Sequence, residues 1–554
     1  MSKLSPKIFK TMKDYSKEQF VKDVTAGVIV AIIALPLSIA LAISSGVSPE
    51  KGIYTAIVAG FLISFLGGSR VQIGGPTGAF MVIVYGIVAK HGIEGLAIAT
   101  VLAGVMMILM GLLRLGSVIK YIPYPVTTGF TSGIAVVIFS SQIKDFFGLK
   151  IDNVPADFID KWSVYFKNVH TFNWQALLVG AVALAIIIFW PRVSRKIPGA
   201  FIALIVTSAA VKFLGMDVET IGTRYGEISA ALPVFHAPQI TLSKISELIL
   251  PAFTIAVLGS IESLLSAVVS DGMIGGKHRS NMELVAQGTA NIASALFGGI
   301  PATGAIARTV ANVKNGGRTP VAGMVHSVTL LLILVLFMPF VKLVPLASLA
   351  AVLIVVAYNM SEWREFKGFF KSPKSDIAVL LLVFVLTVVI DLVKAIEIGL
   401  ILAAFLFMKR MTDVSNVSNI NMDASEEESE NFDFAQESKR IACPRYIQVY
   451  EINGPFFFGA TDKFLTAMES LDRKTETLII RMRNVPAMDA TALKAFRSVI
   501  KNCKRKHISL LITGINPQPL EVLKKTGIFE IIGENHFFYE VEDAINYAKN
   551  RAVN

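Results

Sequence analysis

Two copies of the tripeptide Thr-Gly-Ala begin short apolar segments of the chain, and their flanks indicate a site for an anion. The copies are residues 77–79 and 303–305, and each follows a stretch rich in glycine and proline, residues 74–76 and 298–301. Because these residues interrupt helices, each copy is expected at the N-terminus of a half-helix. Two such N-termini, each with about +0.5 elementary charge, would favour an anion between them. Chance recurrence in a chain rich in these three residues is the alternative.

Two charged side chains stand inside apolar stretches, where a charge is costly. Glu262 lies in the middle of residues 251–270, and Arg308 follows the second tripeptide by one helical turn. Ionisable groups inside a membrane usually face a cavity and serve function. Burial favours the neutral form of a carboxyl group, so Glu262 could carry a coupling proton. The alternatives are a structural ion pair for Glu262 and a snorkelling side chain for Arg308. His326 is expected to be a satisfied packing residue, and a proton relay is the alternative.

The expected anion site combines backbone donors with one counter-charge. Backbone N–H groups of both segments and the two threonine hydroxyls would contact the anion, and the two glycines would let it approach the backbone closely. The arginine would attract the anion without closing on it. The expected contacts are Thr77, Gly78, Ala79, Phe80, Thr303, Gly304, Ala305, Ile306 and Arg308.

The elements that must hold this site are membrane helices. The chain has 554 residues, of which 53% are hydrophobic and 17% are charged. Soluble proteins have roughly 25% charged residues, so this composition is typical of a membrane protein. The apolar runs stop near residue 410, and the rest has the composition of a soluble domain. The net charge of +11 is explained by basic cytoplasmic loops, so no nucleic acid partner is expected.

About fourteen segments qualify as spans when pieces shorter than the usual 20 residues are counted. The long candidates are residues 24–45, 95–113, 125–142, 174–190, 198–214, 248–270, 320–340, 344–359, 375–391 and 394–410, and the short ones are 53–67, 77–89, 282–297 and 303–313. Lysine and arginine gather in alternate loops, which places both termini in the cytoplasm. The two tripeptides then begin matching segments in two halves of about seven spans. An odd number per half predicts that the second half enters the membrane inverted.

These patterns predict four regions. Residues 1–23 form a polar cytoplasmic segment, residues 24–410 the membrane domain, residues 411–442 an acidic flexible linker, and residues 443–554 a cytoplasmic α/β domain. In the last region, strands are expected at 447–452, 477–482 and 508–513, with helices at 491–504, 519–525 and 540–549. Both cysteines, Cys443 and Cys503, lie there, and their spacing supports neither a disulfide framework nor a metal site.

Several stretches of the membrane domain resemble the bacterial SulP (sulphate permease) family, which is related to animal solute-carrier anion exchangers and to prestin. They are Ala-Leu-Pro-Leu-Ser at 34–38, Glu-Ser-Leu-Leu-Ser at 262–266, Asp-Gly-Met at 271–273, Arg-Ser-Asn-Met-Glu-Leu at 279–284 and the run at 298–309. The run Val-Pro-Ala-Met-Asp-Ala-Thr-Ala-Leu at 485–493 resembles the signature loop of STAS domains (sulphate transporter and anti-sigma factor antagonist). The resemblance covers nearly the whole chain.

The resemblance implies a fold and a site. It implies an all-α, seven-plus-seven inverted repeat like that of the uracil permeases, divided into a mobile core and a gate, with a C-terminal α/β STAS domain. The anion would sit between half-helices three and ten and move by an elevator-like shift, and the protein would be a homodimer. Asp489 and Thr491 occupy places where bacterial anti-sigma antagonists carry Asp and a phosphorylatable Ser. An ordinary helix N-cap is the alternative for Asp489.

Two departures from the family pattern bear on the site. Animal members often have Ser before the arginine of segment ten, whereas this chain has Ala307, so that hydroxyl contact is lost. The sodium-dependent bicarbonate branch has Asp and Thr where this chain has Glu262 and Ser266. The difference makes a sodium site less favoured at these two coupling-ion candidates and leaves proton coupling open.

The expected function is secondary active transport of a small inorganic oxyanion, sulphate first, by proton symport or anion exchange. Bicarbonate and C4-dicarboxylates are alternative substrates of the same family, and a non-transporting, prestin-like motor or scaffold is an alternative of another class. The membrane part contains no signature of an enzyme, and no cofactor or metal is expected. The protein is expected in the lipid bilayer of the inner (plasma) membrane, crossing it many times. A cytoplasmic protein partner of the STAS domain is an open expectation.

Overall fold

The computed structural model describes residues 4–553 except 14, 118–121, 152, 156, 195–196, 227–229, 391, 423–440, 470 and 473. The chain divides into two compact units, Met1–Leu400 and Ile401–Asn554. The first unit is built of helices and the second on a five-stranded sheet. The change of architecture follows the change of composition near residue 410.

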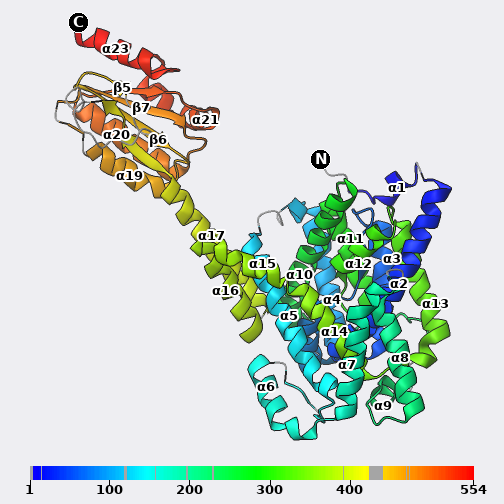
Figure 1. The fold of residues 1–554 in the computed structure, drawn as a ribbon. Helices are drawn as coiled ribbons and strands as arrows, with labels where there is room; N and C mark the ends of the chain where they lie inside the picture. The colour runs from blue at the N-terminus through cyan, green and yellow to red at the C-terminus, as the bar shows by residue number, and fades with distance from the viewer. Residues whose placement is uncertain are drawn as a thin grey trace. The chain divides into compact units, whose positions relative to one another are not determined.

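The helices of the first unit follow the apolar runs of the sequence (Figure 1). They are α2 (Lys17–Ser44), α3 (Pro49–Leu66), α4 (Gly78–Leu112), α5 (Tyr124–Phe147), α7 (Trp174–Phe189), α8 (Gly199–Leu214), α10 (Leu242–Ile274), α11 (Ser280–Leu296), α12 (Ile306–Lys314), α13 (Val321–Val341), α14 (Leu346–Met360), α16 (Lys374–Val389) and α17 (Leu392–Val414), of which α17 begins in the first unit and ends in the second. Every predicted span overlaps one of them. Two predicted spans share α4, which Gly92 interrupts with a φ of 68°. Within the described part of the chain, eight helices are long and apolar enough to cross a membrane.

These helices pack as two sets. One set consists of α2, α3, α4, α10, α11, α12 and α13, and the other of α5, α7, α8, α14 and α16. Small residues allow the helices of a set to approach one another closely. This is expected in a membrane, where the hydrophobic effect does not drive helices together. A Cβ on Gly104 of α4 would lie 2.6 Å from the carbonyl oxygen of Gly288 on α11, so these backbones nearly touch. That these two sets act as the core and the gate that the resemblance implies stays a prediction.

Two buried carboxylates accept hydrogen bonds from the loops next to the two half-helices. Glu283 at the start of α11 accepts hydrogen bonds from the backbone N–H groups of Gly68 and Ser69, at 2.8 and 3.0 Å. Asp23 in α2 accepts one from the backbone N–H of Arg318, just after α12, at 2.8 Å. Both carboxyl groups are fully buried, so their backbone donors replace the lost water. The loops therefore have fixed positions in the core.

Short helices in the loops were not predicted. They are α1 (Ile8–Thr11), α6 (Phe158–Lys167), α9 (Ile221–Tyr225) and α15 (Trp363–Gly368). None is long enough to give an apolar run that crosses a bilayer, which is why a search for spans passes over them. In Figure 1, α6 and α9 lie at the end of the first unit that is opposite α1.

The second unit is an α/β domain. Its sheet has the order β3-β6-β7-β8-β9, in which β3 is antiparallel to β6 and the other neighbours are parallel. The strands are β3 (Asn416–Asn419), β6 (Ile447–Asn453), β7 (Thr477–Asn484), β8 (Ser509–Thr513) and β9 (Phe537–Phe538), with a separate pair, β4 (Asn421–Met422) and β5 (Ile441–Ala442). The helices are α19 (Phe458–Glu469), α20 (Ala490–Arg505), α21 (Pro517–Lys525), α22 (Ile528–Ile532) and α23 (Val541–Val553).

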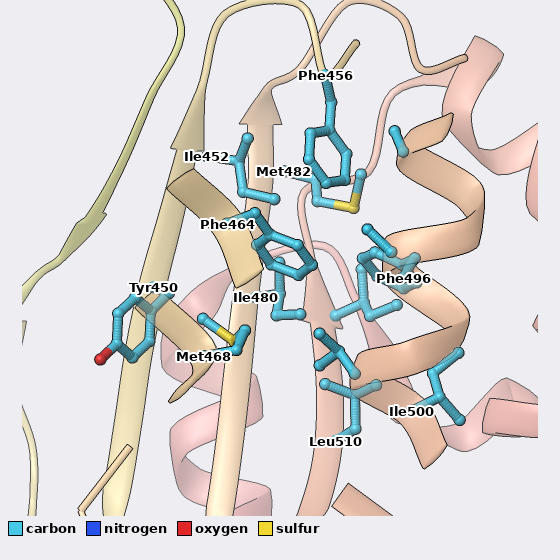
Figure 2. Packing of buried hydrophobic residues seen from close by; sticks show 14 of the residues in the cluster. Tyr450, Ile452, Phe456, Phe464, Met468, Ile480, Met482, Phe496, Ile500 and Leu510 are labelled. Carbon is cyan, nitrogen blue, oxygen red and sulfur yellow. The ribbon is translucent and has the colours of Figure 1, made fainter. Parts of the chain in front are cut away.

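Alternation along the strands separates two hydrophobic cores. Figure 2 shows Ile480 and Met482 of β7 packed against Phe464 of α19 and Phe496 of α20. Ile479, which points to the other face, belongs to the cluster that contains Val541 and other residues of α23. The alternating pattern that predicted the strands thus buries both faces of the sheet.

Two expectations for this region need correction. Helix α19 was not predicted, although its buried Ala460, Phe464 and Met468 repeat every four residues. The predicted linker begins with structure, because residues 411–414 end α17 and the next residues form β3 and β4. β3 pairs with β6 and so belongs to the domain sheet. The acidic run at 426–433 lies outside the described residues.

Candidate functional site

The two breaker stretches of the sequence form a short antiparallel strand pair. β1 (Gly74–Gly75) pairs with β2 (Thr303–Gly304), with Gly74 opposite Gly304 and Gly75 opposite Thr303. The backbone N–H of Ala305 continues the ladder by donating to the carbonyl oxygen of Ile73 at 2.9 Å. Helices α4 and α12 begin within a few residues of the strands, so the structure brings their N-termini together.

Neither helix N-terminus is capped by its own side chain. Thr77 precedes α4 and Ala305 precedes α12, and neither side chain accepts a hydrogen bond from the first helical turn. The first turn of a helix has N–H groups without intrahelical acceptors, and its dipole is positive there. Two uncapped N-termini side by side can therefore hold a negatively charged ligand.

Arg308 lies beneath this junction and does not snorkel. Its side chain is 3% exposed, and Nη2 donates a 2.6 Å hydrogen bond to the carbonyl oxygen of Pro76. Nη1 has no hydrogen-bond partner in the part of the chain that the structure describes. A Cβ on Gly75 would overlap Nη1, and Gly75 has a φ of +153°, so glycine is required at this place for two reasons. The guanidinium therefore adds a buried positive charge beside the N-terminus of α4.

Glu262 contacts the same N-terminus from α10. Its Oε2 accepts a 2.9 Å hydrogen bond from the hydroxyl of Thr77. The carboxyl group lies close enough to Arg308 for electrostatic interaction. The side chain is half-buried, so one carboxyl group stands at the edge of the site where an anion would bind.

Two residues that were predicted to contact the anion have structural roles instead. The hydroxyl of Thr303 is fully buried and donates to the carbonyl oxygen of Gly259 at 3.0 Å, so it does not point into an open site. The space beside Gly304 is filled by the side-chain amide of Gln72, which a Cβ would overlap. Gly304 therefore makes room for Gln72. Sequence reasoning could not find this, since the close neighbour lies in the other half of the chain.

The remaining predicted residues surround the junction in different ways. Ala79, Phe80 and Ala305 are buried, whereas Ile306 is 38% exposed. A Cβ on Gly78 would lie 2.7 Å from Cδ1 of Ile138 on α5, so the start of α4 faces the second set of helices. Ser266 is fully buried and donates to the hydroxyl of Thr309 at 3.3 Å, so it does not contact Glu262.

Three polar side chains that hold the strand pair were not predicted. Gln72 donates to the carbonyl oxygen of Ser263 at 3.0 Å, and the hydroxyl of Thr309 accepts from the backbone N–H of Ile73 at 3.1 Å. The side-chain amide of Asn291 exchanges two 2.8 Å hydrogen bonds with the backbone of Ala302. The sequence contained a sign of these residues, because a polar side chain that is buried among apolar residues needs a hydrogen-bond partner.

His326 is not the satisfied packing residue that we expected. It is fully buried in α13, and neither ring nitrogen has a hydrogen-bond partner among the residues that the structure describes.

In the same described residues, no group of three or more His, Cys, Asp or Glu could hold a metal ion.

In the second unit, Asp489 is the N-cap of α20. One carboxyl oxygen accepts from the backbone N–H of Ala492 at 2.8 Å, and the other accepts from that of Phe458 at 3.1 Å. Both oxygens therefore have structural partners, which agrees with the simpler alternative for Asp489. Thr491 is exposed near the start of the helix. Its phosphorylation stays a prediction.

Comparison with known proteins identifies the family. The Sulfate permease family matches residues 20–383, and the STAS domain family matches residues 438–544. The chain is 44% identical over 531 residues to a Bacillus subtilis protein named "Putative sulfate transporter YvdB", covering 95% of this chain and 97% of the relative. It is 29% identical over 547 residues to "Bicarbonate transporter BicA" of Picosynechococcus sp., covering 95% and 94% of the two chains.

A solved structure shows the same fold. The murine Solute Carrier 26 family member A9 anion transporter, in an inward-facing state, aligns with a TM-score of 0.88 at 18% sequence identity. The alignment covers 99% of this chain and 94% of that one. The full-length sequence matches and the two paired half-helices lead to one conclusion: the chain belongs to the Sulfate permease family and is a multi-pass membrane anion transporter, not an enzyme, with a C-terminal STAS domain.

Proposed function

We propose that this transporter moves a small inorganic oxyanion, with sulphate as the favoured substrate, by secondary active transport. The observation that carries the proposal is the pair of uncapped helix N-termini, Gly78 and Ile306, above the buried guanidinium of Arg308. Backbone N–H groups and one positive charge bind an anion by charge and size. Such binding is moderate, and a transporter must also release its substrate.

Glu262 gives the site a means of coupling to protons. An ionised carboxylate at hydrogen-bond distance from Thr77 would repel an anion held at the N-terminus of α4. Two unit charges 4 Å apart interact by roughly 4 kcal/mol at an effective dielectric constant of 20. Protonation of Glu262 would remove this repulsion, so proton and anion would bind together. This arrangement supports proton symport, and anion exchange is the second mode.

The division of the helices supports elevator-like alternating access. The strand pair, Arg308 and Glu262 all belong to the set that includes α4, α10 and α12. The other set contributes Ile138 of α5 and Met360 of α14, which lie against Gly78. If the first set moves as one body past the second, the site moves with it and keeps its geometry. We place the protein in the plasma membrane as a homodimer, with both termini in the cytoplasm, as the distribution of basic loops favours.

Bicarbonate is the second candidate substrate, favoured by the likeness to the cyanobacterial bicarbonate transporter over 95% of this chain. Uptake by proteoliposomes separates the candidates. Labelled sulphate and bicarbonate would be offered with and without an imposed pH or sodium gradient, with chloride and fumarate as competitors. The proposal expects sulphate accumulation driven by the proton gradient or by a counter-anion. Accumulation of bicarbonate alone would select the second candidate, and uptake of no anion would refute the proposal.

A further inference from the structure

A large cavity in the first unit lies beside helices α4, α5, α6 and α9. Its volume is about 820 Å³, and it is lined by Met81 and Tyr85 of α4, Lys144 of α5, Lys161 of α6 and Arg224 of α9, among others. Met81 directly follows Phe80 in the first turns of α4. The cavity therefore reaches the helix whose N-terminus forms half of the site.

Most charged side chains around this cavity already have partners or lie in solvent. Nη2 of Arg224 donates to Asp145 at 2.8 Å and to Glu219 at 2.6 Å. The ammonium group of Lys144 donates to the carbonyl oxygen of Ile151. Lys150 and Asp217 are exposed, so water screens their charges.

Lys161 is the exception. Its residue is 6% exposed, yet it lines the cavity. Over the described residues its ammonium group forms no hydrogen bond or ion pair, although Asp157 exerts some electrostatic attraction. The hydroxyl of Tyr165, one helical turn further along α6, is also buried without a hydrogen-bond partner in the described residues. The hydroxyl of Tyr165 is thus a buried polar group that lacks an acceptor, and Lys161, a mostly buried residue one turn away, lines the cavity.

Burial makes Lys161 unfavourable for stability. It lowers the pKa of the Lys161 ammonium group, because the low-dielectric surroundings disfavour the charge. A buried charge normally has a counter-charge, since an unpaired one destabilises the folded state. An anion in the cavity would supply the counter-charge that Lys161 lacks among the described residues.

We infer that Lys161 binds a small inorganic anion in this cavity, as a staging position from which the transported anion passes to the junction of α4 and α12. The inference rests on the proposed function for the identity of the anion. Four basic side chains line the cavity against three acidic ones, a weak excess that attracts an anion without trapping it. Lysine suits this role, because its compact, flexible charge holds an anion without bidentate geometry.

The first test is kinetic. Lys161→Met keeps the length of the side chain and removes its charge, and Lys161→Arg keeps the charge. Lys167 is an exposed lysine of the same helix, so Lys167→Met is the matched control. For sulphate added on the cavity side, Lys161→Met should raise KM roughly tenfold with kcat unchanged, as expected for loss of one charged contact. Lys161→Arg should restore most of the affinity, and Lys167→Met should behave as wild type.

The second test needs no transport. Reductive methylation of the wild-type protein, followed by mass spectrometry, measures the reactivity of each amine. Sulphate should protect Lys161 and leave Lys167 unprotected, whereas gluconate at equal ionic strength should protect neither. If sulphate protects Lys161 and no anion is transported, the staging position stands and the proposed function fails. If wild type transports sulphate, while Lys161→Met matches Lys167→Met and Lys161 is not protected, the inference is refuted and the proposed function stands.

Discussion

Replacing Gly304 with alanine puts a methyl group where the side-chain amide of Gln72 lies. The new Cβ would overlap Nε2 and Cδ of Gln72. Gln72 must then move and lose its 3.0 Å hydrogen bond to the carbonyl oxygen of Ser263. Gly304 pairs with Gly74 in the strand pair, so the movement also strains the junction of the half-helices.

The expected size of the effect follows from these contacts. Leaving the buried side-chain N–H group of Gln72 unpaired costs about 1–3 kcal/mol. Forcing extra volume into a well-packed interior costs another 1–3 kcal/mol, approximately. The free energy of unfolding should therefore fall by roughly 2–6 kcal/mol. Gly304→Ala is expected to melt several degrees below wild type and to bind anions more weakly, because the half-helices no longer meet in register.

A double-mutant cycle separates packing from direct anion contact. Gln72→Ala removes the overlapping amide, so Gly304→Ala should cost much less in that background, with an interaction free energy of at least about 1 kcal/mol. Melting curves and equilibrium anion binding would be measured for the four proteins. If Gly304→Ala keeps full thermal stability but loses binding, and Gln72→Ala does not restore it, then Gly304 contacts the anion and the packing argument is wrong.

The other predictions concern the charges of the site and the second unit. Glu262→Gln should abolish the dependence of uptake on a proton gradient, and a mutant that accumulates substrate with the wild-type pH profile would assign coupling elsewhere. Arg308→Ala should weaken equilibrium anion binding by roughly ten- to a hundredfold, or about 1.4–2.8 kcal/mol; unchanged affinity in a folded variant would move the site. A chain ending at Arg410 should still insert and bind anion, and complete loss of binding in a folded truncation would contradict this. Asp489→Ala should lower the unfolding free energy of the C-terminal domain by about 0.5–2 kcal/mol, since the cap of α20 is lost. Thr491→Ala should be neutral, and equal losses in both variants by chemical denaturation would rule out the capping argument.

Helix ends and strand alternation were predictable because their causes are local. Glycine and proline before residues 77 and 303 stop one element and start the next, and the structure begins α4 and α12 there. The period-two pattern of 477–482 likewise became β7. Helices with a short or mixed apolar pattern, such as α6 and α19, were missed because the pattern among neighbouring residues is too weak to predict them.

The sequence by itself determined that the chain spans a membrane many times, that two half-helices begin at repeated tripeptides, and that Glu262 and Arg308 are charges among apolar neighbours. Only the tertiary structure decided which atoms these groups meet. Arg308 reaches the carbonyl oxygen of Pro76, 232 positions away, and Thr77 reaches Glu262, 185 positions away. Propensity and hydropathy act over a few neighbouring residues, whereas a buried polar group takes whichever partner the packed helices place within 3 Å or so. That is why Gly304 could be recognised as special from the sequence, while its neighbour Gln72 could not.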